Sequence, residues 1–203
     1  MSAIEIGRLL RAGTTGCVMG CRVTQLDAPA FGGLVRIPLE PGYQVFGLIY
    51  DIHIDDDGLV RQLVTSENIS NDVLLDNRTN RNVPVEISVI FCGYEQDGRI
   101  SHLLPPRPPL SLDAIYNCTA EELVRFTGNG QFGYFRHLLR TEELPTDELL
   151  AAHLQQASRA HAEGGNPDWA HNAAAELIIL LRDDYPSLMG VLSALRDAQI
   201  EGV

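Results

Sequence analysis

The sequence predicts an α+β protein in which a small antiparallel β-barrel precedes an α-helical bundle. Three observations support this fold class. The first hundred residues contain short β-rich runs separated by turn residues, a proline-rich stretch follows, and the remainder has helical periodicity. We therefore assign residues 1–104 to a barrel, 105–110 to a connector and 111–203 to a helical module.

The N-terminal runs are rich in apolar, β-branched and aromatic residues, with glycine, proline and Asp/Asn clusters between them. Short strands without intervening helices favour a closed or nearly closed barrel, because closure removes exposed strand edges. The segment 59–75 is ambiguous and could contain a short helix or an irregular excursion. Strands are expected over residues 4–10, 15–23, 33–39, 43–54 and 83–95.

The expected strand over 43–54 differs from the others because both of its alternating sets are apolar. Val45 and Ile49 belong to one set, and Phe46 and Leu48 belong to the other. A strand with one face in water would alternate apolar with polar residues. We therefore expect both faces of this strand to be covered.

The proline-rich stretch has four prolines in the five residues of "PPRPP". Such a composition is typical of an extended connector. It also holds two overlapping P-x-x-P frames, which can dock into aromatic grooves of a partner. Both interpretations stay open, and the candidate interaction residues are Pro105, Pro106, Arg107, Pro108 and Pro109.

Helix signals dominate after the connector. Thr119 and Glu122 have the spacing of a capping box, Thr146 is the expected N-cap of a later helix, and Gly128 and the pair at 164–165 are expected stops. Pro186 suits a first helical position. Helices are expected over residues 119–128, 145–165, 168–184 and 186–198, and a short helix or a turn over 131–141.

Charge and composition exclude several functions. The formal net charge is −12, which disfavours nucleic-acid or anionic-membrane binding by bulk electrostatics. All 15 basic residues are arginine, so the chain has no lysine for a Walker motif or a Schiff base. No signal peptide and no membrane-spanning apolar run is recognisable, so a cytoplasmic protein with free thiols is expected.

The stretch "TTGCVMGCRV" (14–23) admits three hypotheses: a phosphate loop, half of a metal or redox site, and a glycine-rich barrel strand. The missing lysine excludes a P-loop. Cys17 and Cys21 would share one face of a strand but lie about 13 Å apart, too far to bind one ion. The barrel strand is therefore the preferred interpretation, with a nucleophilic thiol as an alternative.

Other candidate sites fail on spacing. The acidic turn "HIDDDG" lacks both ends of an EF-hand loop, because His53 and Val64 fall where acidic ligands are needed. The histidines show no paired metal-ligand spacing and belong to no catalytic motif. No metal and no cofactor is therefore expected.

The N-terminal region resembles the HAS barrel, the β-barrel of HerA-type DNA translocases and of the catalytic-ring subunits of rotary ATP synthases. The resemblance covers roughly residues 3–100 and rests on Ile6-Gly7-Arg8-Leu9, on Thr14-Thr15 and on Val45-Phe46-Gly47-Leu48-Ile49. It implies a barrel that holds an assembly together. ATP hydrolysis is not implied, because no Walker motif follows.

These observations predict a non-enzymatic assembly or adaptor protein whose barrel binds a partner or self-associates, possible partners including a separately encoded ring ATPase. One alternative is a regulatory nucleotide- or small-molecule-binding barrel that uses Arg8, Arg22 or Arg36. A third is a thiol-dependent enzyme that uses Cys17 or Cys21. Direct nucleic-acid binding and membrane insertion are not expected.

Overall fold

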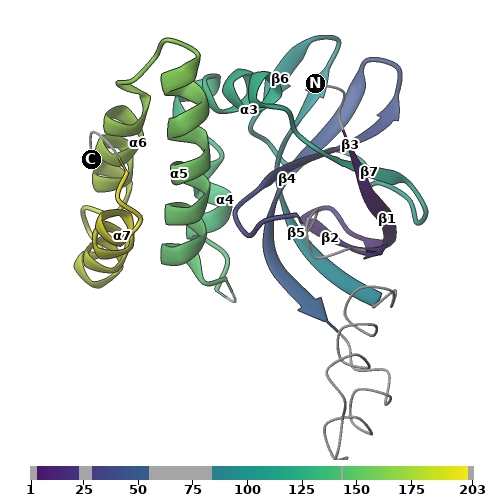
Figure 1. The fold of residues 1–203 in the computed structure, drawn as a ribbon, viewed down its shortest axis with the longest axis horizontal. Helices are drawn as coiled ribbons and strands as arrows, with labels where there is room; N and C mark the ends of the chain where they lie inside the picture. Colours follow the sequence, from purple (N-terminus) through teal and green to yellow (C-terminus); the bar gives the residue numbers. More distant parts are fainter. Residues whose placement is uncertain (1–3, 23–28, 55–83, 143, 201–203) are drawn as a thin grey trace, which may run out of the picture.

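The computed structural model describes residues 4–22, 29–54, 84–142 and 144–200. It contains a β-barrel with a layered group of helices against one side (Figure 1). The α+β fold class is therefore confirmed. The predicted excursion over 59–75 lies outside the described residues.

Six antiparallel strands close the barrel. The sheet order is β2-β1-β7-β3-β4-β5-β6, and an additional pairing of β2 with β5 completes the circle. The short strand β6 pairs with the end of β5 and stands outside that circle. The strands are β1 (Glu5–Ala12), β2 (Gly16–Arg22), β3 (Leu34–Glu40), β4 (Tyr43–Ile54), β5 (Pro84–Gln96), β6 (Arg99–Ser101) and β7 (Ala114–Asn117).

The last barrel strand corrects the predicted domain boundary. Strand β7 lies within residues 111–203, which the sequence assigned to the helical module, yet it pairs with β1 and β3. The proline-rich connector therefore joins two parts of the barrel, and the barrel continues to Asn117. Four residues, "AIYN", are too few to display a strand periodicity, which explains the error.

The helices follow the predicted order, and several of their ends are confirmed. Thr119 and Glu122 form the capping box of α3, and Gly128 and Gly164 are the C-caps of α3 and α5. Thr146 is the first residue of α5, and its cap is Pro145, so that N-cap prediction was wrong. The elements are α3 (Ala120–Thr127), the 3-10 turn η1 (Gly130–Phe132), α4 (Phe135–Leu139), α5 (Thr146–Glu163), α6 (Trp169–Leu180) and α7 (Tyr185–Asp197).

Two apolar cores share the strand β4. Val45 and Ile49 are buried inside the barrel, whereas Phe46 and Leu48 are buried against the helices. The prediction that this strand is covered on both faces is therefore confirmed. Helix α5 lies next to the barrel, and α6 and α7 form the outermost layer (Figure 1).

Polar contacts fix the helices to the barrel at defined positions. Arg36 of β3 forms an ion pair with Glu122 of α3, with Nε and Oε1 2.7 Å apart. The buried Glu95 carboxylate of β5 accepts hydrogen bonds from both terminal nitrogens of Arg125 and from Gln44. Within the described residues no helix is long and apolar enough to cross a membrane.

Candidate interaction surface

The proline-rich connector packs partly onto the barrel. Pro105 and Pro109 are buried, whereas Pro106, Arg107 and Pro108 are exposed. Each P-x-x-P frame thus pairs one buried proline with one exposed proline. A polyproline II ligand has three residues per turn and would present both prolines of a frame together. Docking through these five residues stays a prediction, and the accessible part is Pro106 to Pro108.

Arg107 already has partners on the barrel. Its Nη2 lies 3.2 Å from Oε1 of Glu40, and its guanidinium lies over the Tyr43 ring, 5.9 Å from the centroid. Both side chains of the ion pair are exposed, so the pair contributes less than about 1 kcal/mol. Arg107 therefore orients the connector without strongly stabilising it.

Three leucines are exposed where the turn after the connector lies against β1, and we call them the barrel patch: Leu10 of β1, and Leu110 and Leu112 of the turn. The Leu112 amide donates to the Leu9 carbonyl at 2.8 Å, and the Ser111 hydroxyl donates to the Leu10 carbonyl at 3.1 Å. These bonds hold the turn after the connector against β1. Leu10, Leu110 and Leu112 are 47%, 72% and 70% exposed.

Leu112 is unusual in conformation as well as in exposure. Its φ of 73° lies in the left-handed region, which costs a side chain with a Cβ roughly 1–2 kcal/mol and which glycine or asparagine adopts more readily. An exposed leucine adds little to folding here, because most of its surface stays in water. Neither the backbone nor the core of the protein requires leucine at this position.

A second exposed apolar group lies at the outer layer of helices, and we call it the helix patch: Ile178, Ile179, Leu180, Tyr185 and Met189. The first three end α6, the last two begin α7, and residues 181–184 connect them. Their exposed fractions range from 44% to 68%. The sequence analysis did not predict this patch, although the uninterrupted run "LIILL" (177–181) could have indicated it, because an amphipathic helix would include polar residues there.

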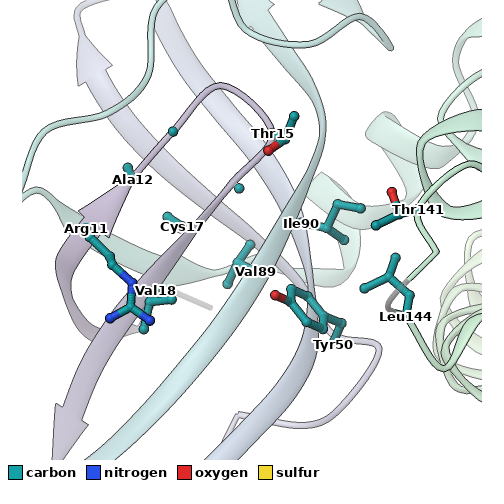
Figure 2. A pocket seen from close by; sticks show the side chains of 12 residues that line it. Arg11, Ala12, Thr15, Cys17, Val18, Tyr50, Val89, Ile90, Thr141 and Leu144 are labelled. Atoms are coloured by element: carbon teal, nitrogen blue, oxygen red, sulfur yellow. The ribbon is translucent and has the colours of Figure 1, made fainter.

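Figure 2 shows a cleft between the turn that joins β1 to β2 and the segment that joins α4 to α5. Its volume is about 480 Å³. Thr15, Tyr50 and Thr141 contribute hydroxyl groups to the lining, and Arg11 contributes a guanidinium. Residues 15–18, "TGCV", of the stretch that begins at Thr14 therefore form part of one wall of this cleft.

The cysteines of that stretch are barrel core residues. Cys17 and Cys21 are both buried in the apolar interior of the barrel. Burial raises the pKa of Cys17 to about 12 and also raises the pKa of Cys21. Both thiols are protonated at neutral pH and are weak nucleophiles in this state. Among the described residues, no group of three His, Cys, Asp or Glu side chains is placed to hold a metal ion.

The candidate phosphate-binding arginines have acidic partners. Arg8 pairs with Glu5 at 3.1 Å, and Arg36 pairs with Glu122 and lies over the Tyr116 ring. Of Arg22, only the backbone is described, in β2. Arg8 and Arg36 are therefore neutralised locally and line none of the described cavities together.

The chain matches no family model and no curated protein.

Proposed function

We propose that the protein is a non-enzymatic assembly or adaptor protein whose barrel binds a protein partner or a second copy of the chain. The observation that supports this proposal is the barrel patch. Its leucines are exposed, and Leu112 occupies a backbone conformation that disfavours leucine. A residue that is unfavourable for the isolated fold is best explained by a contact outside it.

The proposal retains the resemblance to the HAS barrel and the cytoplasmic location expected from the sequence. A barrel of that family would act as the assembling part of a larger complex. A separately encoded ring ATPase is then one type of partner. In the proposed role binding would use side chains rather than strand addition, because each of the six strands that close the barrel has a neighbour on both sides.

A paired substitution tests the proposal. Leu110→Ser with Leu112→Asn removes the apolar surface, and asparagine tolerates the left-handed backbone at 112. We expect the variant to fold normally and to lose partners that the wild type captures in a pull-down from its host. Ile4→Thr is the control, because Ile4 is 66% exposed but lies about 20 Å from Leu10 along the same chain segment. Equal capture by the paired variant and the wild type would reject the proposal.

A second candidate function is regulatory binding of a nucleotide or another small molecule. The cleft of Figure 2 favours it, because its volume is within the range of small-molecule sites, roughly 300–1,000 Å³. Arg11 is the basic residue of its lining, and a phosphate or carboxylate there would compete with Glu86, whose Oε2 lies 4.0 Å from Arg11 Nη1. A thermal-shift measurement with ATP and ADP tests this candidate, and an unchanged Tm at millimolar nucleotide would argue against nucleotide binding.

A further inference from the structure

A second cavity, with a volume of about 460 Å³, lies among the helices. Three segments line it: the C-terminal half of α5, the residues just before α6 and the residues just after α7. Figure 1 shows these three helices side by side. The volume is within the range of small-molecule sites, roughly 300–1,000 Å³. The cavity is therefore large enough to hold a small ligand.

Hydrogen bonds fix the segments that line this cavity. The side-chain amide of Gln155 donates to the Ala198 carbonyl at 2.8 Å, which joins α5 to the end of α7. The backbone amide of Asn166 donates to the His161 carbonyl at 2.8 Å, which joins the end of α5 to the turn before α6. Ile200 lines the cavity and is buried, so part of the wall is apolar. The cavity is thus formed by the fold itself.

The cavity also contains charges that the fold leaves unpaired. Arg159 and Glu163 of α5 and Asp168, just before α6, line it and are exposed. Among the described residues, none of these three side chains has an ion-pair or hydrogen-bond partner. Arg159 and Glu163 are four residues apart, a spacing at which opposite charges on a helix commonly pair. Asp168 is the N-cap of α6, yet its side chain makes no capping hydrogen bond.

The arginines at other cavities differ from Arg159. Arg11 in the cleft of Figure 2 lies 4.0 Å from Glu86. Arg125, at a smaller cavity beside β5, donates both terminal nitrogens to the Glu95 carboxylate. Those two guanidinium groups already have acidic partners within the chain. Arg159 has none among the described residues, so its donors are free for a ligand.

We propose that this cavity binds a small zwitterion with an apolar side chain, either a free amino acid or a dipeptide. Arg159 binds the carboxylate of the ligand, which a guanidinium can hold through two parallel hydrogen bonds. Glu163 and Asp168 bind its ammonium group, and Ile200 contacts its apolar side chain. The site lies apart from the barrel patch, so the proposal is independent of the proposed function.

The sign of the charges selects this class of ligand. The lining carries one positive and two negative side chains. A phosphate or another polyanion would be repelled by both carboxylates, and a simple cation would be repelled by Arg159. A zwitterion instead offers an opposite charge to each of the three groups. Because these groups come from α5 and from the start of α6, the bound ligand links the two helices and stabilises the folded chain.

Isothermal titration calorimetry and thermal-shift measurements on the full chain test the proposal, with L-leucine, L-valine and L-leucyl-L-leucine as probes. We expect saturable binding and a Tm that rises with the concentration of the probe. Tighter binding of the dipeptide than of either amino acid would identify a peptide as the source of the zwitterion, and the reverse order a free amino acid. If none of the three probes binds saturably up to about 10 mM, the proposal is overturned.

Two variants locate the binding. Arg159→Gln removes the guanidinium and Asp168→Asn removes a carboxylate, and each should weaken the binding of the zwitterion at least about tenfold. Arg182→Gln is the matched control, because Arg182 is also exposed but pairs with Asp183 and lines none of the described cavities. Circular dichroism checks that each variant is folded. Unchanged affinity in Arg159→Gln and Asp168→Asn would place the ligand elsewhere and overturn the proposal.

Ligand analogues separate a direct contact from an effect on the fold. L-Leucinamide lacks the carboxylate, and N-acetyl-L-leucine lacks the ammonium group. Arg159→Gln should weaken the binding of leucine but leave that of leucinamide unchanged, whereas Asp168→Asn should spare N-acetyl-leucine, because each variant removes a charge whose partner the analogue lacks. A variant that weakens all three ligands by the same factor would show that its side chain contacts neither group, which would also overturn the proposal.

Discussion

His153 of α5 and Tyr134 form a hydrogen bond that is completely buried between the helices and the barrel, with His153 Nε2 and the Tyr134 hydroxyl oxygen 3.0 Å apart. The other ring nitrogen, Nδ1, lies 3.1 Å from the carbonyl oxygen of Gly32. A carbonyl can only accept, so Nδ1 carries the proton and Nε2 accepts from tyrosine. Burial lowers the pKa of His153 and so keeps the imidazole neutral at pH 7, and its two hydrogen bonds join α5 to the barrel.

This arrangement predicts a loss of stability in mild acid. Burial lowers the pKa of His153 to about 4, whereas an unfolded histidine titrates near 6.5. As the pH falls below about 6.5, the unfolded chain binds a proton at this histidine that the folded chain does not bind. The free energy of unfolding therefore decreases until the pH reaches about 4. Between pH 7 and pH 5 the free energy of unfolding should fall by roughly 2 kcal/mol from this residue.

Urea unfolding at a series of pH values checks this prediction, with His153→Gln as the control that cannot titrate. The pKa values of His102, His137 and His161 are also lowered, first of all by burial, so they add to the same trend. The variant should be less stable at pH 7 but less sensitive to pH. Identical pH dependence in both proteins would show that His153 is not the titrating group.

Removal of the Glu95 carboxylate should destabilise the junction between barrel and helices. Burial alone would raise the pKa of Glu95, but hydrogen bonds from Arg125 and Gln44 outweigh it and lower the pKa. Glu95→Ala leaves Arg125 and Gln44 without this acceptor and should cost about 2–3 kcal/mol. The folded state favours the ionised carboxylate, so this contribution is present above the unfolded pKa and is lost below about pH 4.5.

Glu40 provides the matched comparison for Glu95. It also pairs with an arginine, Arg107, but both side chains of that pair are exposed. Glu40→Ala should therefore cost less than about 1 kcal/mol. Chemical denaturation of the two variants measures the difference, and equal losses would contradict the role assigned to burial.

The thiols should react slowly in the native protein. Burial raises the pKa of Cys17 and Cys92 to about 12, and it is also the main cause of the raised pKa values of Cys21 and Cys118. Iodoacetamide at neutral pH should label the native chain far more slowly than the urea-unfolded chain, with mass spectrometry as the readout. Rapid labelling of Cys17 or Cys21 in the native chain would instead favour the thiol-dependent enzyme.

The sequence predicted the strands whose patterns extend over several residues, and it failed where the information is not local. The double apolar alternation of β4 predicted two covered faces, and the structure confirms both. The strand β7 has four residues and obtains its stability from pairing with β1 and β3, which no local pattern encodes. The barrel patch was missed for a similar reason, because hydrogen bonds from Leu112 to Leu9 and from Ser111 to Leu10 bring the turn against β1 only after the barrel has closed.

Gly47 lies in the stretch 45–49 that resembles the HAS barrel, and strand β5 leaves no space beside it. A Cβ at Gly47 in β4 would lie 2.5 Å from a methyl carbon of Val89 and 2.7 Å from the carbonyl oxygen of Ile90 on β5. Strand β5 cannot withdraw, because it also pairs with β2 on its other edge. Gly47→Ala should therefore lower the free energy of unfolding by about 1–3 kcal/mol through overpacking.

Gly13→Ala is the control, since a Cβ at that position meets nothing within 4 Å. Comparable Tm values for the two variants would show that β4 and β5 can separate without cost.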